Sequence, residues 1–150
     1  MALTKYVKKR QFDSTPEPRG KVSSDNGRIY VVQKHDASKL HYDLRLEING
    51  VLWSWAVPKE PVNDSSVKRL AAKVEDHPVE YAAFEGVIPK GNYGAGTVEI
   101  WDKGTFEILS LLENKLVIEI LGEKLGGKFA LIRMPRIGRN SWLFFKTKDD

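Results

Sequence analysis

A strict alternation of apolar and polar residues between Leu40 and Leu46 is the feature that most restricts the fold of this chain. Successive side chains of a β-strand point to opposite faces of its sheet. A strand here therefore places leucine and tyrosine on one face, whereas the other face carries His41, Asp43 and Arg45. This pattern is typical of an antiparallel sheet with one face against a core.

The simplest interpretation of the polar face is a solvated surface, but its residue types indicate chemistry. The chain has only 3 histidines, and two of them, His35 and His41, lie in this stretch. Two imidazoles and a carboxylate suit a divalent first-row metal, and we expect a loop to bring His35 back beside His41 and Asp43. Three protein ligands leave positions for water and substrate, as catalytic sites require. Arg45 follows on the same face, where its guanidinium fits phosphate oxygens.

Several other short segments rich in β-branched and aromatic residues predict a mainly antiparallel all-β fold. Asn49-Gly50 is a favoured two-residue hairpin turn. One short helical turn is expected at 77–81, and so little helix indicates a compact β-barrel or sandwich. The expected strands are 28–33, 40–48, 51–57, 71–75, 97–101, 105–109, 115–121, 128–134 and 141–147.

Two stretches rich in turn-forming residues lie between these strands. Asp102-Lys103-Gly104 predicts a hairpin turn between strands 97–101 and 105–109. Gly86–Gly96 predicts a loop whose glycines let the backbone pass close to another group, although such spacing also occurs in plain loops.

The composition bounds the class of protein. A chain of 150 residues with 41% hydrophobic residues is large enough for one domain with a real core. No apolar run approaches the roughly 20 residues of a membrane span, and the N-terminus lacks a signal-peptide core. Because the chain has no cysteine, a metal would require nitrogen and oxygen ligands. These features predict a cytoplasmic protein.

The positive charge is concentrated at the N-terminus. Positions 1–21 contain six of the 24 basic residues but only two of the 20 acidic ones, so this segment carries the whole net charge of +4. Residues 1–27 show no helical or strand periodicity, which predicts a flexible basic arm before a single domain at 28–150. Such an arm binds phosphates without sequence specificity, or serves only as a solubilising tail.

Longer motifs extend beyond the alternating strand. They are Gln33-Lys34-His35-Asp36-Ala37-Ser38, His41-Tyr42-Asp43-Leu44-Arg45, Trp53-x-Trp55-Ala56-x-Pro58-Lys59, Glu75-Asp76-His77-Pro78-x-x-Tyr81, Phe84-Glu85-Gly86-x-Ile88-Pro89-x-Gly91-x-Tyr93-Gly94-x-Gly96 and Trp101-Asp102-x-Gly104. This series resembles the 3′-phosphoesterase domain of bacterial DNA ligase D, which also occurs as a stand-alone protein in archaea and bacteria. The resemblance runs from about Arg10 to the end of the chain.

The resemblance implies a β-barrel with a metal-dependent active site. His35, His41 and Asp43 would bind Mn²⁺, and Zn²⁺ or Co²⁺ also suits this ligand set. The implied catalytic residues are Arg45, His77, Tyr81, Arg10 and Glu17, and those that support the site or the substrate are Gln33, Lys59, Arg69 and Glu75. The family usually has Arg-Asp-Phe where this chain reads Arg10-Gln11-Phe12.

The activity implied by the resemblance is healing of 3′ ends. A phosphodiesterase step removes a 3′-terminal ribonucleoside from a primer end, and a phosphomonoesterase step then removes the 3′-phosphate to leave a 3′-OH. The expected partners are DNA or RNA 3′ ends, including a primer–template with a terminal ribonucleotide, and a ligase or polymerase acting in trans. The protein is expected to be a monomer.

Three alternatives compete with this interpretation. His41, Asp43 and His77 imitate the two-histidine, one-carboxylate site of non-haem Fe(II) oxygenases, but His35 would then have no role, and no arginine follows His77 before Arg133 to bind a 2-oxo acid. A non-catalytic nucleic-acid-binding barrel explains the basic arm and the aromatic residues, but not the His-x-Asp-x-Arg row. A purely structural β domain explains neither.

Overall fold

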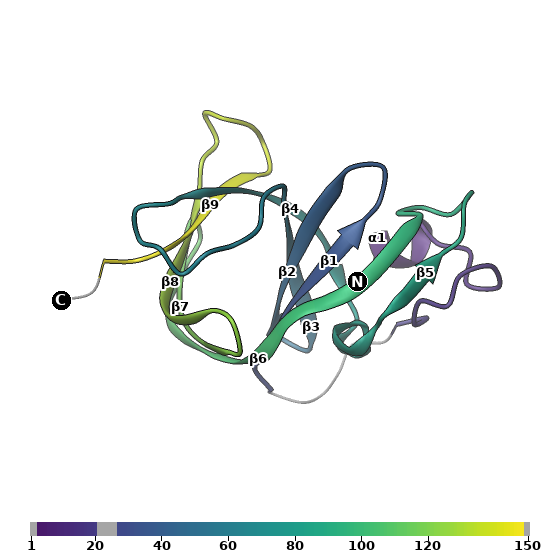
Figure 1. Cartoon of the computed structure of the whole chain (residues 1–150), viewed down its shortest axis with the longest axis horizontal. Coiled ribbons are helices and arrows are strands. Elements are labelled where there is room, and N and C mark those ends of the chain that lie inside the picture. Colours follow the sequence, from purple (N-terminus) through teal and green to yellow (C-terminus); the bar gives the residue numbers. More distant parts are fainter. Residues whose placement is uncertain (1–2, 21–26, 149–150) are drawn as a thin grey trace.

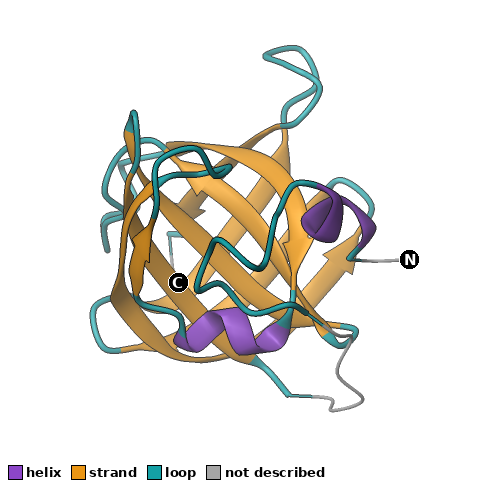
Figure 2. Ribbon diagram, turned by 90° about the vertical axis from the view of Figure 1, so that its right-hand side faces the viewer, coloured by secondary structure: helices purple, strands orange, loops and turns teal. Residues whose placement is uncertain are grey.

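Nine antiparallel strands form the body of the molecule, which is seen here in a computed structural model that describes residues 3–20 and 27–148. Eight of them close into a barrel, because the sheet runs from β1 through β4, β9, β8 and β7 to β6, and β6 pairs with β1 (Figures 1 and 2). The strands are β1 Ile29–Asp36, β2 Leu40–Ile48, β3 Val51–Val57, β4 Arg69–His77, β5 Gly86–Ile88, β6 Gly96–Leu112, β7 Lys115–Gly122, β8 Gly126–Arg133 and β9 Ser141–Lys146. The prediction of an all-β barrel is confirmed.

Among the residues that the structure describes, helix is confined to two short elements that lie outside the barrel, α1 (Thr4–Lys8) and the 3₁₀ helix η1 (Val79–Ala83) (Figure 2). The predicted helical turn is thus present, but it begins after His77, which ends β4, because Pro78 holds an extended backbone conformation. Neither helix is long and apolar enough to cross a membrane.

Strands β1 to β3 form two consecutive hairpins that fix the register of the polar row. Asn49 and Gly50 both have positive φ angles, 55° and 80°, which suits the tight turn predicted between β2 and β3. In the first hairpin His35 lies directly opposite His41. The expected loop thus brings His35 back beside His41, but it is shorter than predicted, because β1 continues past Gln33 to Asp36.

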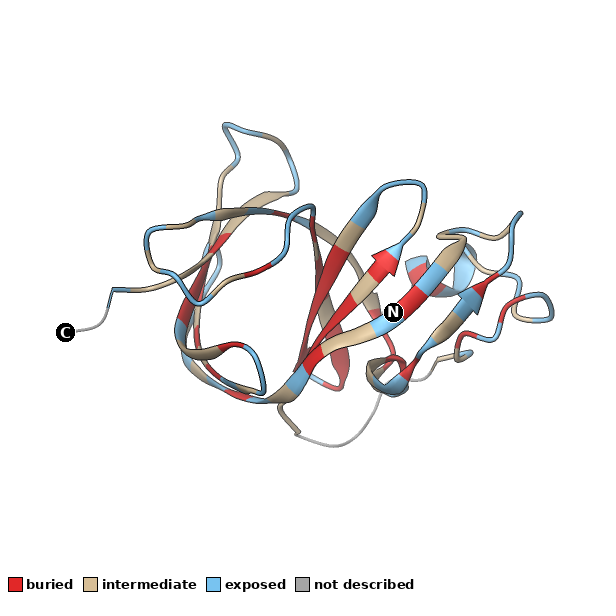
Figure 3. Cartoon of the chain, viewed as in Figure 1, coloured by how far each residue is buried: buried red, intermediate tan, exposed pale blue. Residues whose placement is uncertain are grey.

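The two faces of β1 and β2 serve different purposes. Side chains such as Tyr30, Val32, Leu44 and Leu46 point inward and join the main core of the barrel. The row of His41, Asp43 and Arg45 therefore lies on the outer face, yet Asp43 and Arg45 are buried there as well. Most of β2 is accordingly coloured as buried in Figure 3. Another layer of the molecule must cover this part of the outer face.

The covering layer consists of the N-terminal segment, η1 and β5. Tyr6 of α1 is fully buried in a second apolar cluster with Tyr81, Phe84 and Ile88. Residues 3–20, for which the sequence predicted a flexible arm, thus pack on the barrel, where α1 is held by buried Tyr6. Residues 1–2 and 21–26 of the predicted arm lie outside the described part of the chain.

Strand β6 is a single element of 17 residues, so the hairpin turn predicted at Asp102-Lys103-Gly104 is wrong. The Asp102 carboxylate is buried and accepts hydrogen bonds from the Tyr30 hydroxyl and from three backbone N–H groups at residues 123–125. Gly104 lets β7 approach closely, because a Cβ atom there would lie 2.0 Å from the carbonyl oxygen of Leu121. Asp102 and Gly104 thus lie within a strand, from which they make tertiary contacts with other parts of the chain.

Candidate functional site

A cavity of about 360 Å³ opens on the outer face of the barrel, between the polar row and the covering layer. Its floor comes from β1, β2 and β4, and its rim from the N-terminal segment and the glycine-rich loop before β6. Nine of the residues predicted to act in the site line this cavity: Arg10, Glu17, His35, His41, Asp43, Arg45, Glu75, His77 and Tyr81.

His35, His41 and Asp43 form a compact set of metal-ligand atoms, which lie within 4.8 Å of one another. Oδ2 of Asp43 is 3.5 Å from Nδ1 of His35 and 3.2 Å from Nε2 of His41. The cross-strand pairing of His35 with His41 brings the two rings together, and Asp43 follows on the same face of β2. The sequence-predicted ligands are thus adjacent in space.

Both imidazoles are oriented by backbone carbonyls. Nε2 of His35 lies 2.6 Å from the carbonyl oxygen of Gly94, and Nδ1 of His41 lies 3.0 Å from that of Lys39. Because a carbonyl only accepts, each of these nitrogens carries a proton, and the other nitrogen of each ring, which faces Asp43, is the one that would bind a metal. Histidine ligands of protein-bound metals are commonly held in this way. The three residues therefore fit a divalent metal with nitrogen and oxygen ligands.

Arg45 is buried next to the ligand set. Its Nε donates to Oε1 of Gln33 at 2.6 Å, and its Nη2 lies 3.5 Å from Oδ2 of Asp43. Burial alone would raise the pKa of the Asp43 carboxyl, but Arg45 and the two histidines hold it below its usual range, so Asp43 is ionised. Nη1 of Arg45 is buried and has no hydrogen-bond partner among the described residues. This guanidinium group therefore retains a donor nitrogen for an anion.

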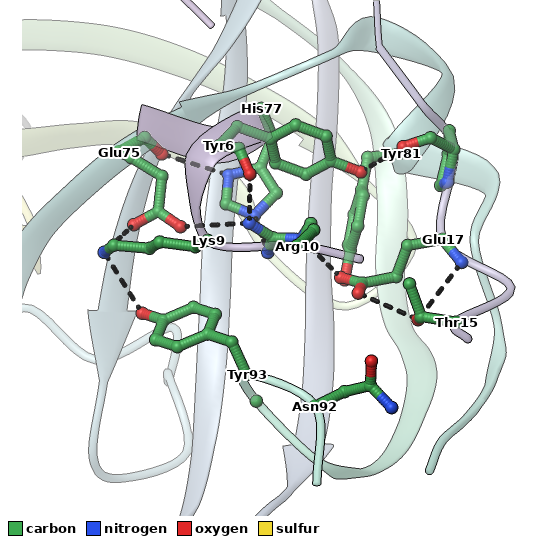
Figure 4. A network of polar contacts seen from close by, with 12 residues as sticks. Tyr6, Lys9, Arg10, Thr15, Glu17, Glu75, His77, Tyr81, Asn92 and Tyr93 are labelled. Atoms are coloured by element: carbon green, nitrogen blue, oxygen red, sulfur yellow. Dashed lines mark hydrogen bonds and ion pairs between the residues drawn. The ribbon is translucent and has the colours of Figure 1, made fainter. Parts of the chain in front are cut away.

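A second guanidinium group, that of Arg10, reaches the cavity from the N-terminal segment (Figure 4). Its Nε lies 2.9 Å from Glu17 and its Nη1 lies 3.4 Å from Glu75, while its Cζ is 4.0 Å from the centroid of the Tyr6 ring. Only 5% of the Arg10 side chain is exposed. Two carboxylates and an aromatic ring thus fix this cation at the cavity wall.

His77 contacts this arginine rather than the metal-ligand set. Nη2 of Arg10 lies 3.3 Å from Nε2 of His77, and Nδ1 of His77 lies 3.0 Å from the carbonyl oxygen of Glu75. Because a guanidinium only donates, Nε2 is the acceptor and Nδ1 carries the proton. Burial, with Arg45 and Arg10 nearby, holds the pKa of His77 well below its usual value. His77 is therefore neutral in the free protein and not an imidazolium.

Glu17 joins Arg10 to the wall of the site (Figure 4). Its Oε2 accepts a hydrogen bond of 2.6 Å from the Tyr81 hydroxyl as well as the Arg10 contact, and its Oε1 accepts one of 3.0 Å from Thr15. Burial raises the pKa of Tyr81 above its usual value, so its hydroxyl remains a donor. Glu17 thus acts as an acceptor that positions two residues of the cavity.

Comparison with known proteins decides the family. The sequence model of the DNA ligase D 3′-phosphoesterase domain matches residues 33–133. The chain belongs to the DNA ligase D 3′-phosphoesterase domain family.

Curated relatives of this domain are multifunctional non-homologous end joining proteins named LigD. The chain is 51% identical to the protein from Pseudomonas aeruginosa, 42% identical to that from Mycobacterium tuberculosis and 44% identical to that from Mycolicibacterium smegmatis. Each match covers 98% of this chain but only 19–21% of the relative. The chain therefore spans about a fifth of the length of these relatives.

Three further positions that the family resemblance predicted do not line the cavity. Gln33 is fully buried behind it, and its amide nitrogen donates to the carbonyl oxygens of Tyr81 and Phe84, which ties Arg45 to η1. Lys59 is exposed outside the cavity, and Arg69 donates to the carbonyl oxygen of Glu60 at 2.9 Å.

One residue beside the site, Lys9, was not singled out from the sequence, and one glycine of the predicted loop has a specific contact there. Lys9 lies 3.2 Å from Glu75, and its Nζ is 4.7 Å from the centroid of the Tyr93 ring. Gly94 has a φ angle of 75°, and a Cβ atom there would lie 3.3 Å from Cε1 of His35. The expectation that the glycine-rich loop lets the backbone approach another group thus applies to His35. No local pattern distinguishes Lys9 from the other lysines near it.

Proposed function

We propose that this 3′-phosphoesterase domain is a metal-dependent enzyme that heals 3′ ends of nucleic acids. In the diester step it removes a 3′-terminal ribonucleoside and leaves a 3′-phosphate, and in the monoester step it releases that phosphate to leave a 3′-OH. One observation carries the proposal: the ligand set of His35, His41 and Asp43 lies beside the buried, unpartnered Nη1 of Arg45.

The ligand set supports Mn²⁺, and Zn²⁺ or Co²⁺ would also suit two imidazoles and a carboxylate. When bound, such an ion supplies Lewis-acid polarisation of a phosphoryl oxygen and lowers the pKa of water. Arg45 and Arg10 contribute positive charge at two sides of the same cavity, where they would bind non-bridging phosphate oxygens.

The two steps break different bonds. In the diester step the oxygen of a water molecule bonds to phosphorus, the P–O5′ bond to the terminal ribonucleoside breaks, and O5′ leaves with the electron pair and gains a proton. In the monoester step the P–O3′ bond breaks in the same way. His77 faces this cavity, and the negative charge of a bound phosphate would favour its protonated form, which can supply that proton.

The arrangement gives little support to the alternatives. An oxygenase-type site requires His77 beside His41 and Asp43, but the ligand set found among the described residues contains His35 instead, and Nε2 of His77 contacts Arg10. A non-catalytic nucleic-acid-binding barrel has no need for a buried ligand set with oriented imidazoles.

The proposed substrates are DNA or RNA 3′ ends, including a primer–template that ends in a ribonucleotide. The relatives' names refer to non-homologous end joining, and we propose that the domain, as a monomer, prepares ends for a ligase or polymerase acting in trans.

A labelled strand with a single 3′-terminal ribonucleotide tests the proposal. Chelator-treated protein should leave the strand intact, and added Mn²⁺ should restore first the 3′-phosphate product and then the 3′-OH product. Full activity in protein shown by elemental analysis to be metal-free would contradict the metal mechanism. Failure to release the ribonucleoside with any of the three metals would contradict the diester step.

A further inference from the structure

Four lysines border two hollows that adjoin the active-site cavity. The larger hollow, of about 560 Å³, is lined by Lys5, Lys8 and Lys73, and the smaller, of about 310 Å³, by Lys5, Lys9 and Lys73. We call Lys5, Lys8, Lys9 and Lys73 the lysine track. Three of them come from α1 and the residue after it, and Lys73 comes from β4, against which α1 packs.

The lysine track is continuous with the active-site cavity. Val74 and Glu75 line both hollows as well as the cavity, and Tyr93 lines both the smaller hollow and the cavity. A chain that leaves the cavity past Glu75 and Tyr93 therefore enters the lysine track directly.

The charges along the lysine track are only partly neutralised. Lys9 pairs with Glu75 at 3.2 Å and Lys73 with Asp76 at 3.6 Å. Lys5 and Lys8 are exposed, and neither has an ion-pair partner among the described residues. The two outer positions thus remain available for an anionic partner.

The lysines of α1 are held in place rather than carried on a loose tail. Lys5 and Lys8 are three residues apart in the helix and share a face. Tyr6, between them in sequence, is fully buried in the second apolar cluster, which fixes the orientation of that face. Two exposed ammonium groups at fixed positions next to a phosphate-binding cavity suit a polyanion whose charges are regularly spaced along a chain.

We propose that the lysine track binds the sugar-phosphate backbone of the strand whose 3′ end occupies the cavity, on the 5′ side of the reacting phosphate. This inference rests on the proposed function, because that function places the strand end in the cavity. The contacts involve phosphates alone, so they would add affinity without sequence preference.

Binding of a 3′-phosphorylated single strand of about 12 nucleotides, a length within the usual site sizes for single strands, tests this inference. The measurement is made in chelator, so that no turnover occurs. The test variant is Lys5→Ala/Lys8→Ala, in which alanine preserves the helix. The matched control, Lys115→Ala/Lys128→Ala, removes the same charge from exposed positions on β7 and β8.

The test variant should bind the strand more weakly, and the slope of log K against log salt should fall by about 1.4, or roughly 0.7 per lost phosphate contact. The ratio of the wild-type to the variant binding constant should therefore fall about sevenfold between 50 and 200 mM salt. Affinity for a nucleoside 3′-phosphate should not change, the control should match the wild type, and Lys5→Arg/Lys8→Arg should retain the slope.

An unchanged slope in the test variant, or an equal loss in the control, would overturn the inference. Because binding is measured without turnover, the result does not depend on whether the enzyme performs the proposed reaction. Conversely, a wild-type protein that releases no product with any of the three metals contradicts the proposed function, whatever the salt slope of the variant.

Discussion

Replacing Glu17 with glutamine should destabilise the whole domain, because this carboxylate joins the N-terminal segment to η1, which follows β4 of the barrel. Its side chain is fully buried and accepts hydrogen bonds from Arg10, Tyr81 and Thr15. Removing one partner of a buried ion pair typically costs about 3–5 kcal/mol. We expect the lower end, about 3 kcal/mol, because the Thr15 hydroxyl can turn to accept from the new amide and Glu75 still faces Arg10.

For a domain of this size, a loss of about 3 kcal/mol lowers the melting temperature by roughly 6–12 °C. Thermal unfolding of Glu17→Gln measures this, and turnover should fall as well, because Arg10 loses its anchor at the cavity. The control Asp13→Asn makes the same chemical change in the same segment. It breaks only the ion pair with Arg19, where the Asp13 side chain is fully exposed, so no measurable shift is expected. A Glu17→Gln protein that melts within about 1 °C of the wild type would refute the docking of this segment.

Two further predictions concern the histidines. His77→Ala should keep near-stoichiometric metal while losing most turnover, whereas His41→Ala should lose both metal and turnover. If elemental analysis finds no metal in His77→Ala but a full complement in His35→Ala, then His77 and not His35 is a metal ligand. In metal-free protein, the depressed pKa of folded His77 means that the unfolded chain takes up its proton first as the pH falls through about 6.5. The stability contributed by neutral His77 is therefore present above that pH and is lost below it, by up to about 1.4 kcal/mol per pH unit. His77→Gln should reduce this loss in chemical denaturation between pH 7 and 5, and an unchanged pH dependence would contradict a neutral buried His77.

Most strands, and the proximity of His35, His41 and Asp43, could be predicted because they depend on local patterns. The alternation in β2 places His41, Asp43 and Arg45 on one face, and Asn49-Gly50 fixes the hairpin that follows. The periodicity of apolar residues and the presence of turn-forming residues extend over only a few positions, so both can be recognised directly in a sequence. Even here the end of β1 was missed, since a polar segment such as Lys34–Asp36 gives little apolar signal.

The covering layer could not be predicted, because its contacts join distant parts of the chain. Arg10 contacts His77 across 67 positions, and Tyr81 contacts Glu17 across 64. The N-terminal segment shows no periodicity, and its proline and glycine residues indicated flexibility, yet buried Tyr6 and Glu17 hold it in place. The hairpin turn at Asp102 and Gly104 was wrongly predicted for a related reason. Both residue types favour turns, but here they make contacts with residues 121–125, which are distant in sequence.

The contacts of Arg45 have a consequence for the thermodynamics of ligand binding. An arginine side chain loses roughly 2 kcal/mol of rotamer entropy when it is fixed. Gln33 and Asp43 already hold the Arg45 guanidinium in place while its Nη1 remains unpartnered. That loss is therefore incurred when the chain folds and not when an anion arrives. Ordering of this side chain should consequently add almost no unfavourable entropy to anion binding.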